Sequence, residues 1–225
     1  MDNTVHSLYV GEVRDKSSHT TPTFILRFHI LLNGGLPNPI LYLYFYKTKY
    51  IMKRMTIDSA HSEVGFKVKH LMISTVKGNF STFGGGVQED GSVFVSINTN
   101  TINTGNVDRD NHLKSADFFN SEENHTITFA GKMSEDMTTV TGSVTIKGIT
   151  KEIELNTEYN GMGVDPWGNT KHGWEITGTI NRNDFGLTWN APLETGGVLV
   201  SENVTLTMDI QMMEVVEEMV TESAE

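Results

Sequence analysis

The sequence contains no cysteine among its 225 residues and only five prolines. Without cysteine the chain can form no disulfide, present no thiolate nucleophile and build no cysteine-ligated zinc site. Long apolar runs are missing too, because no segment approaches the roughly 18 apolar residues that a membrane-spanning helix needs. We therefore expect no stable insertion of the chain into a membrane.

A positive net charge is also missing, since the formal net charge at pH 7 is −11. Residues 1–54 contain seven Lys and Arg against three Asp and Glu, a net +4, which leaves −15 for the remainder. An acidic body of this kind repels phosphate backbones, so we expect no nucleic-acid partner. The charge is typical of a soluble protein.

The first 54 residues do not share the pattern of the rest. They hold two short apolar segments, at 24–32 and 40–46, and Met52–Met55 resembles a translation start. We interpret residues 1–54 as a leader that is non-native or reflects a mis-assigned start. The alternative is a membrane-surface anchor, because the aromatic residues of 40–46 adjoin Lys47.

A secretory signal is not readable in this leader. The first charged residue is Asp2, and no small-residue cleavage site follows either apolar segment. We therefore predict a cytoplasmic location, with the periplasm as the alternative.

From Thr56 onward, apolar and polar residues alternate with a period of two, which is typical of strands with one buried face. The alternating segments begin at Val64, Val93, Ile127, Val140, Ile153, Trp174 and Val204. Turn-forming sequences separate them at 89–92, 134–136, 147–148, 160–161 and 167–169. Seven or more strands with short connections must hide their edges in a sandwich or a closed barrel. The pattern predicts an all-β fold.

The connection Arg109–Phe119 lies between two strand-like segments and is unusually apolar for a connection. Its Leu113, Phe118 and Phe119 must be buried against the core or over a cavity. We expect a short helical or irregular connection near residues 109–119, with Asn111–Phe119 as the helical candidate.

The same connection raises the possibility of catalysis, because His112 lies between Asp110 and Asp117. A His–carboxylate pair can act in general acid–base catalysis, but no pattern for a nucleophile or an oxyanion hole accompanies it. Neither this group nor His125 beside Glu123 matches a zinc or calcium motif. We expect no catalytic residues, no metal and no cofactor, and interpret these side chains as partners of loop backbone.

An apolar ligand is the remaining candidate, because aromatic side chains recur from Phe66 to Trp189. Ligand pockets are mostly apolar, and a long acyl or isoprenoid chain gains about 0.8 kcal/mol per buried CH₂. The same rings could instead fill a solid core. The residues alone leave both interpretations open.

Several motifs, taken together and in order, resemble the YceI family of bacterial lipid-binding proteins. They are Ile57–Ser62, Phe66–Leu71, Val76–Phe80, Arg109–Phe119 and Asn183–Leu187. The resemblance covers about residues 56–214. It implies an antiparallel, lipocalin-like β-barrel with an elongated apolar cavity over residues 55–214, followed by an acidic tail at 215–225.

The resemblance also implies a set of ligand-binding residues. Candidates for the cavity wall are Phe66, Val68, Phe80, Phe129, Ile146, Phe185 and Leu206. Candidates for its lid or mouth are Leu113, Phe118 and Phe119.

Arg109 and His112 are the basic candidates for binding a polar or pyrophosphate head group, since arginine offers a planar fork of donors. The rival role for Arg109 is an ion pair with Asp110 or Asp117. A neutral head group, such as an amide or a quinone ring, also suits an acidic body.

We predict a binding protein that stores or transports a long-chain apolar lipid, of polyisoprenoid or fatty-acyl type, and that can pair into a homodimer as the resemblance implies. One alternative is an enzyme acting on an isoprenoid or acyl substrate through His112. The other is a stress-related barrel with a filled core and no ligand.

Overall fold

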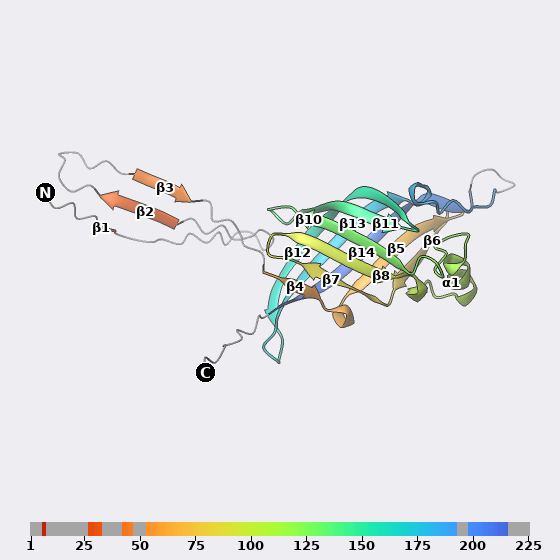
Figure 1. Cartoon of the computed structure of the whole chain (residues 1–225), viewed down its shortest axis with the longest axis horizontal. Helices are drawn as coiled ribbons and strands as arrows, with labels where there is room; N and C mark the ends of the chain where they lie inside the picture. The colour runs from red at the N-terminus through yellow and green to blue at the C-terminus, as the bar shows by residue number, and fades with distance from the viewer. Residues whose placement is uncertain (1–5, 8–26, 33–41, 47–52, 193–197, 216–225) are drawn as a thin grey trace, which may run out of the picture. The chain divides into compact units, whose positions relative to one another are not determined.

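The computed structural model describes residues 6–7, 27–32, 42–46, 53–192 and 198–215 (Figure 1). The chain divides into two compact units, Met1–Ile51 and Met52–Glu225. In the first unit, β1 (His6–Ser7), β2 (Arg27–Leu32) and β3 (Tyr42–Tyr46) form an antiparallel sheet in the order β1-β2-β3. Most of the predicted leader 1–54 lies outside the described residues, as does the predicted acidic tail 215–225 apart from Val215.

The second unit consists mainly of strands. They are β4 (Met55–Ile57), β5 (Glu63–His70), β6 (Ser74–Phe80), β7 (Phe83–Val87), β8 (Ser92–Asn98), β9 (Ile102–Asn103), β10 (Thr126–Met133), β11 (Thr139–Ile146), β12 (Ile149–Val164), β13 (Thr170–Asn181) and β14 (Val200–Glu214). The connections contain the 3₁₀ helices η1 (Ser59–His61), η2 (Thr99–Thr101) and η3 (Arg182–Phe185), and helix α1 (Val107–Lys114). Within the described ranges, none of the helices has the length and apolar character of a membrane span.

The strands close into a ring. Hydrogen-bonded neighbours run in the order β13-β12-β11-β10-β8-β7-β4-β14, and β13 also pairs with β14. β4 and β5 pair with successive parts of β14, so they act as one interrupted strand, and β6 and β7 follow one another in the same way. The result is an antiparallel eight-stranded barrel, which confirms the lipocalin-like fold predicted above.

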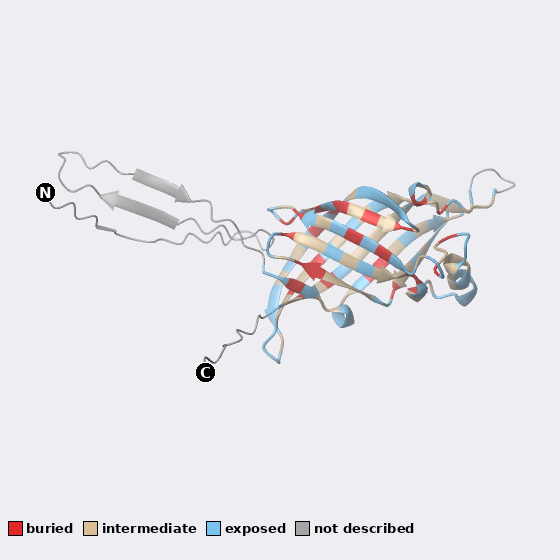
Figure 2. Cartoon of the chain, in the orientation of Figure 1, coloured by how far each residue is buried: buried red, intermediate tan, exposed pale blue. Residues whose placement is uncertain are grey.

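Buried and more exposed residues alternate along the strands of the barrel (Figure 2). In β11, Val140, Gly142, Val144 and Ile146 are buried, while the residues between them are half-buried or exposed. Branched apolar side chains suit such a pleated, half-buried surface. The inward faces together give an apolar interior, as the period of two predicts.

The apolar connection forms its helix earlier than the candidate Asn111–Phe119 indicated. α1 spans Val107–Lys114 because Asn106 caps its N-terminus: the Asn106 Oδ1 accepts a hydrogen bond from the backbone N–H of Arg109 at 2.9 Å. Phe118 therefore lies in the turns after the helix, not within it.

The Asn160-Gly161 sequence does not separate two strands, so that turn prediction is wrong. It lies inside β12, where the register with β13 shifts between Tyr159 and Gly161. Gly161 has φ 107°, a conformation that glycine adopts without steric cost, and the chain forms a β-bulge there instead of reversing. The reversal comes later, at the Asp165–Asn169 turn, where the Gly168 N–H donates to the Asp165 carbonyl at 3.0 Å.

Charged side chains tie together the barrel end that carries the β12–β13 turn. Lys171 Nζ on β13 lies 2.5 Å from Asp58 Oδ2, and His61 Nδ1 lies 2.9 Å from the same oxygen. The hydrogen bond from Lys171 is the largest of the effects that lower the pKa of Asp58 to about 2; burial opposes it, and the His61 hydrogen bond adds to it. This carboxylate therefore joins β13 to the segment between β4 and β5.

Polar and aromatic rings fill the interior at that same end. Buried His172 lies in hydrogen-bonding distance of the Tyr159 hydroxyl, 2.9 Å from Nδ1, and of Glu214 Oε1, 3.0 Å from Nε2. The Trp174 ring stacks on His172 with centroids 5.7 Å apart. We call the barrel end formed by these residues and by Asp58 the polar end.

Gly142→Ala is expected to destabilise the barrel by about 1–3 kcal/mol, the usual cost of overpacking. A Cβ at Gly142 would lie 2.3 Å from the Cα of Gly131 and 2.4 Å from the carbonyl oxygen of Ala130, so β10 and β11 must move apart. Gly163→Ala is the matched control, because a Cβ there meets nothing within 4 Å. Urea unfolding measures both variants, and equal midpoints would contradict the close approach of the two strands.

Lys171→Met should remove about 1–2 kcal/mol of stability at neutral pH, judged from the depressed pKa of Asp58. That contribution is present above the ordinary pKa of 3.8 and is lost as the pH falls through about 2, because Asp58 is then protonated in both states. The difference between wild type and variant should therefore shrink on acidification. Unfolding free energies across this range test it; a pH-independent difference would count against the ion pair.

Lys132→Met supplies the control for that comparison. Lys132 Nζ lies 3.6 Å from Asp90, but both side chains are well exposed, so the pair should contribute little at any pH.

Candidate ligand-binding cavity

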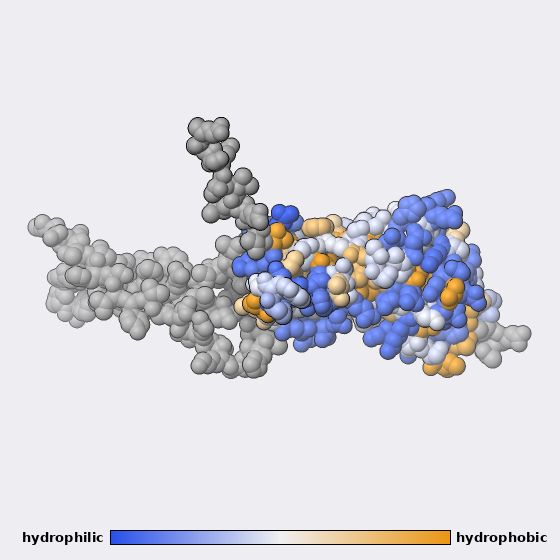
Figure 3. All heavy atoms as spheres, turned by 90° about the horizontal axis from the view of Figure 1, so that it is seen from below, coloured by the Kyte–Doolittle hydropathy of each residue, from blue (hydrophilic) through white to orange (hydrophobic). Residues whose placement is uncertain are grey.

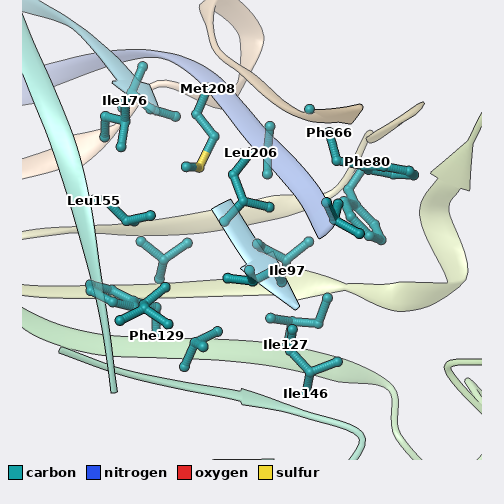
Figure 4. A pocket seen from close by; sticks show the side chains of 18 of the residues that line it. Phe66, Phe80, Ile97, Ile127, Phe129, Ile146, Leu155, Ile176, Leu206 and Met208 are labelled. Carbon is teal, nitrogen blue, oxygen red and sulfur yellow. The ribbon is translucent and has the colours of Figure 1, made fainter. Parts of the chain in front are cut away.

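The barrel encloses a cavity of about 210 Å³ (Figure 4). It is elongated, because inward residues of β14 line it from Val204 to Met212, roughly 26 Å of strand at about 3.3 Å per residue. A single buried water needs only about 10–15 Å³. The interior is therefore not a solid core.

The cavity wall is apolar with one exception. Figure 4 shows side chains from several strands pointing toward the same space, including Ile97, Ile127, Leu155, Ile176 and Met208. All the other lining side chains are also aliphatic, methionine, phenylalanine or glycine, except Arg182. Such a wall suits an apolar chain, because almost no polar atom of the wall would lose its hydration to the ligand.

Two phenylalanine rings lie along the wall because glycines leave room for them. A Cβ at Gly78 would lie 2.4 Å from the Phe66 Cζ, and a Cβ at Gly131 would lie 2.6 Å from the Phe129 Cζ. Each ring therefore covers the glycine instead of projecting across the barrel. The glycines help to keep the interior open.

Aromatic residues cover the cavity at the end opposite the polar end. Phe119 packs edge-on against Phe80 with ring centroids 6.0 Å apart, and Phe118 lies 5.4 Å from Trp189. Phe118 and Phe119 follow α1, whereas Trp189 lies in the β13–β14 connection. We call this the helix end; here two connections far apart in sequence meet over the cavity.

Arg182 is the charged residue of the wall and lies at the helix end. Its guanidinium donates to four backbone carbonyls, those of Leu187, Trp189, Val200 and Ser201. Only 4% of the residue is exposed, and burial lowers the pKa of the guanidinium below its ordinary value. Because Leu187 and Val200 also line the cavity, Arg182 fixes the part of the wall that the β13–β14 connection supplies.

Nine of the twelve residues predicted to bind ligand line the cavity. They are Phe66, Val68, Phe80, Leu113, Phe118, Phe119, Phe129, Ile146 and Leu206. The structure does not place Phe185, Arg109 or His112 in the wall. Phe185 is the last residue of η3, is 1% exposed and belongs to the packed core.

Arg109 and His112 instead stabilise the connection around α1. Arg109 donates from Nε to the Thr104 hydroxyl at 2.7 Å and from Nη2 to the Thr104 carbonyl at 2.8 Å. Asp110 accepts from the backbone N–H and hydroxyl of Thr104, so Arg109 and Asp110 both hydrogen-bond to this one residue. His112 Nε2 lies 2.8 Å from Asp117 Oδ2. The described residues contain no group of three or more His, Asp and Glu side chains arranged for a metal.

Sequence reasoning overlooked Arg182 as a wall residue and Trp189 as part of the cover. A signal for Arg182 was present: the inward positions Ile176, Gly178 and Ile180 continue with a period of two to residue 182. No comparable signal marks Trp189, because its partners His112 and Phe118 lie more than 70 residues earlier in the chain.

Solved structures with the same barrel include two of low identity. Burkholderia cenocepacia BcnA is 19% identical, with a TM-score of 0.59 over 69% of this chain and 98% of that chain. A polyisoprenoid binding domain from Saccharophagus degradans is 13% identical, with a TM-score of 0.59 over 73% and 100%. At these identities the likeness shows a shared fold.

Closer relatives share sequence as well as fold. A UPF0312 protein of Staphylococcus aureus (strain MSSA476) is 44% identical over 160 residues, covering 68% of this chain and 93% of the relative. The Campylobacter jejuni YCEI protein is 34% identical, with a TM-score of 0.56 over 71% of this chain and 96% of that chain. The profile of the YceI-like domain matches residues 55–212, so this chain belongs to the YceI family.

Proposed function

We propose that this protein binds a long-chain apolar molecule, of polyisoprenoid or fatty-acyl type, inside the barrel. The observation that supports it is the elongated cavity whose wall is apolar except at Arg182. Each buried CH₂ contributes about 0.8 kcal/mol. A long chain can therefore reach useful affinity without strong polar contacts, even after the cost of immobilising it is subtracted.

The two ends of the cavity favour one orientation of such a ligand. At the polar end the interior is filled by His172 and Trp174, which are buried and hold their places by hydrogen bonding and stacking. At the helix end, hydrogen bonds to backbone carbonyls use four of the five N–H donors of Arg182. We place the apolar tail toward the polar end and an acceptor-bearing head group near Arg182.

A binding role agrees better with the site than a catalytic one. The pair that could act as acid and base, His112 and Asp117, is not part of the cavity wall, and the His112 ring packs against Trp189 at 4.7 Å. A bound chain would thus meet apolar side chains along its length. We propose storage or transport of the ligand, and the name of the Saccharophagus degradans polyisoprenoid binding domain supports the binding that either role requires.

Organic extraction of the purified full chain, followed by mass spectrometry, tests the class of ligand directly. We expect an isoprenoid or fatty-acyl species at close to one molecule per chain. An empty extract, together with no binding of added polyprenyl or acyl lipids, would contradict the proposal.

Leu206→Trp should block the cavity and weaken binding of a fluorescent fatty-acid analogue at least about tenfold, because the larger ring occupies space that the chain needs. Thr205→Trp is the matched control: Thr205 is the exposed neighbour on the same strand, so the same new ring faces solvent. Fluorescence titration of both variants checks the prediction, with unfolding curves to confirm that each is folded. Equal binding by the two variants would place the ligand elsewhere.

A further inference from the structure

The turn between β5 and β6 exposes three consecutive apolar side chains. Leu71 is 36% exposed, Met72 64% and Ile73 84%. Figure 3 shows apolar surface at the right-hand end of the barrel, the end where Figure 1 places β5, β6 and α1. Single exposed apolar residues are ordinary, but a contiguous group at a hairpin tip indicates a surface that meets a partner.

The backbone conformation of this turn is strained for the residues that occupy it. The Ile73 N–H donates to the His70 carbonyl at 3.2 Å, and the two central residues, Leu71 and Met72, have φ 54° and 56°. Positive φ at both central residues is the feature of type I′ turns that favours Asn-Gly, because bulky side chains are strained there. Two large apolar side chains therefore occupy positions where the fold alone favours small or polar ones.

Three lysines lie on the outer face of the same hairpin. Lys67, Lys69 and Lys77 are exposed, and Lys67 lies directly opposite Lys77 in the strand register. Like charges in that position repel each other, so these lysines, like the apolar residues of the turn, do not stabilise the hairpin. In a chain of net charge −11 they form a local basic surface, with Glu63 at the far end of β5. We call Leu71–Ile73 and these lysines the hairpin tip.

Hydrogen bonds connect the hairpin tip to the cavity wall. The Leu71 N–H donates to the Leu199 carbonyl at 2.8 Å, and His70 pairs with Val200. Val200 lines the cavity, and its carbonyl accepts a hydrogen bond from Arg182 at 3.3 Å. The tip is therefore part of the rim of the helix end.

We propose that the hairpin tip docks on an anionic lipid bilayer. Leu71, Met72 and Ile73 enter the boundary between head groups and acyl chains, while the lysines pair with lipid phosphates. This docking rests on the proposed function, because it has a role only if the cavity binds an apolar ligand. It would bring the helix end of the cavity to the layer from which the ligand is taken or to which it is delivered.

Two other assignments fit the observations less well. The hairpin at the polar end also exposes Met162, Val164 and Trp167, but its Lys171 is engaged by Asp58, so it offers no comparable basic surface. A second copy of this chain, docked through the same tip about a two-fold axis, would bring the lysines of both copies together. A bilayer with anionic head groups relieves their repulsion instead.

The test is flotation of the full chain with vesicles of phosphatidylcholine alone or of phosphatidylcholine and phosphatidylglycerol in equal amounts. The full chain should float with the anionic vesicles, and high salt should weaken the binding. The variant L71N/M72G/I73T should bind at least about tenfold more weakly because it removes the apolar contact. It should not unfold at lower denaturant concentration than wild type, since Asn-Gly suits the turn.

Two further variants separate the contributions. K67Q/K69Q/K77Q should lose the preference for anionic vesicles, whereas M162S/W167S, which alters the exposed tip at the other end, should bind like wild type. No flotation of the full chain, or equal flotation of L71N/M72G/I73T, would overturn the proposal. Loss of binding in M162S/W167S alone would overturn it in favour of the polar end. Loss of a dimer, rather than of vesicle binding, in L71N/M72G/I73T would overturn it in favour of self-association.

Docking and ligand binding can fail separately. Leu206→Trp should still float with anionic vesicles, because the tip is unchanged. L71N/M72G/I73T should still bind a soluble fluorescent fatty-acid analogue, because the cavity is unchanged. Normal titration of the analogue with no flotation would overturn the docking surface while leaving the cavity proposal intact.

Discussion

The pairing of β13 with β14 is the constraint on which the rest of the barrel depends. Eleven consecutive residues pair without a register shift, from Lys171 with Met213 to Asn181 with Asn203, and this seam closes the ring. Closure removes the open sheet edges and forces one face of each strand inward. An eight-stranded barrel has room inside for side chains or for one slender ligand. The sizes of the inward side chains therefore decide whether the interior is a core or a cavity.

Those sizes are arranged unevenly along the barrel axis. At the polar end, the rings of Trp174 and His172 are buried inside the barrel, whereas glycines at 78 and 131 let Phe66 and Phe129 lie against the wall. Wall atoms that face empty space lose dispersion contacts, so an open interior costs stability that a filled core would keep. A ligand that binds only the folded state would restore those contacts and shift the folding equilibrium in its favour. The open interior is thus consistent with the proposed ligand binding, since stability alone favours a filled core.

The sequence predicted what depends on local pattern and missed what depends on distant contacts. Alternation identified the strands, and the motif resemblance identified the barrel; periodicity alone could not choose between a barrel and a sandwich. Arg109 and His112 were candidates for a head group because they are basic and adjoin Phe118 in sequence, yet the folded chain uses them to hold Thr104 and Asp117. Asn160-Gly161 was read as a turn because a bulge and a reversal use the same residues. Contacts such as Trp189 with Phe118 require the fold itself.

The two ends of the barrel differ in the interactions that must be broken to open them. At the polar end, opening would break the hydrogen bonds of buried His172 and separate Lys171 from Asp58. Each of these polar groups would lose its partner, which costs free energy. At the helix end, the cover is made of aromatic contacts of the α1 connection with β6 and with the β13–β14 connection, and separating these rings leaves no polar group unpaired. Arg182 holds the strand side of that rim in place through the carbonyls of Trp189 and Val200. An apolar ligand would therefore pass most easily through the helix end, beside the β5–β6 turn.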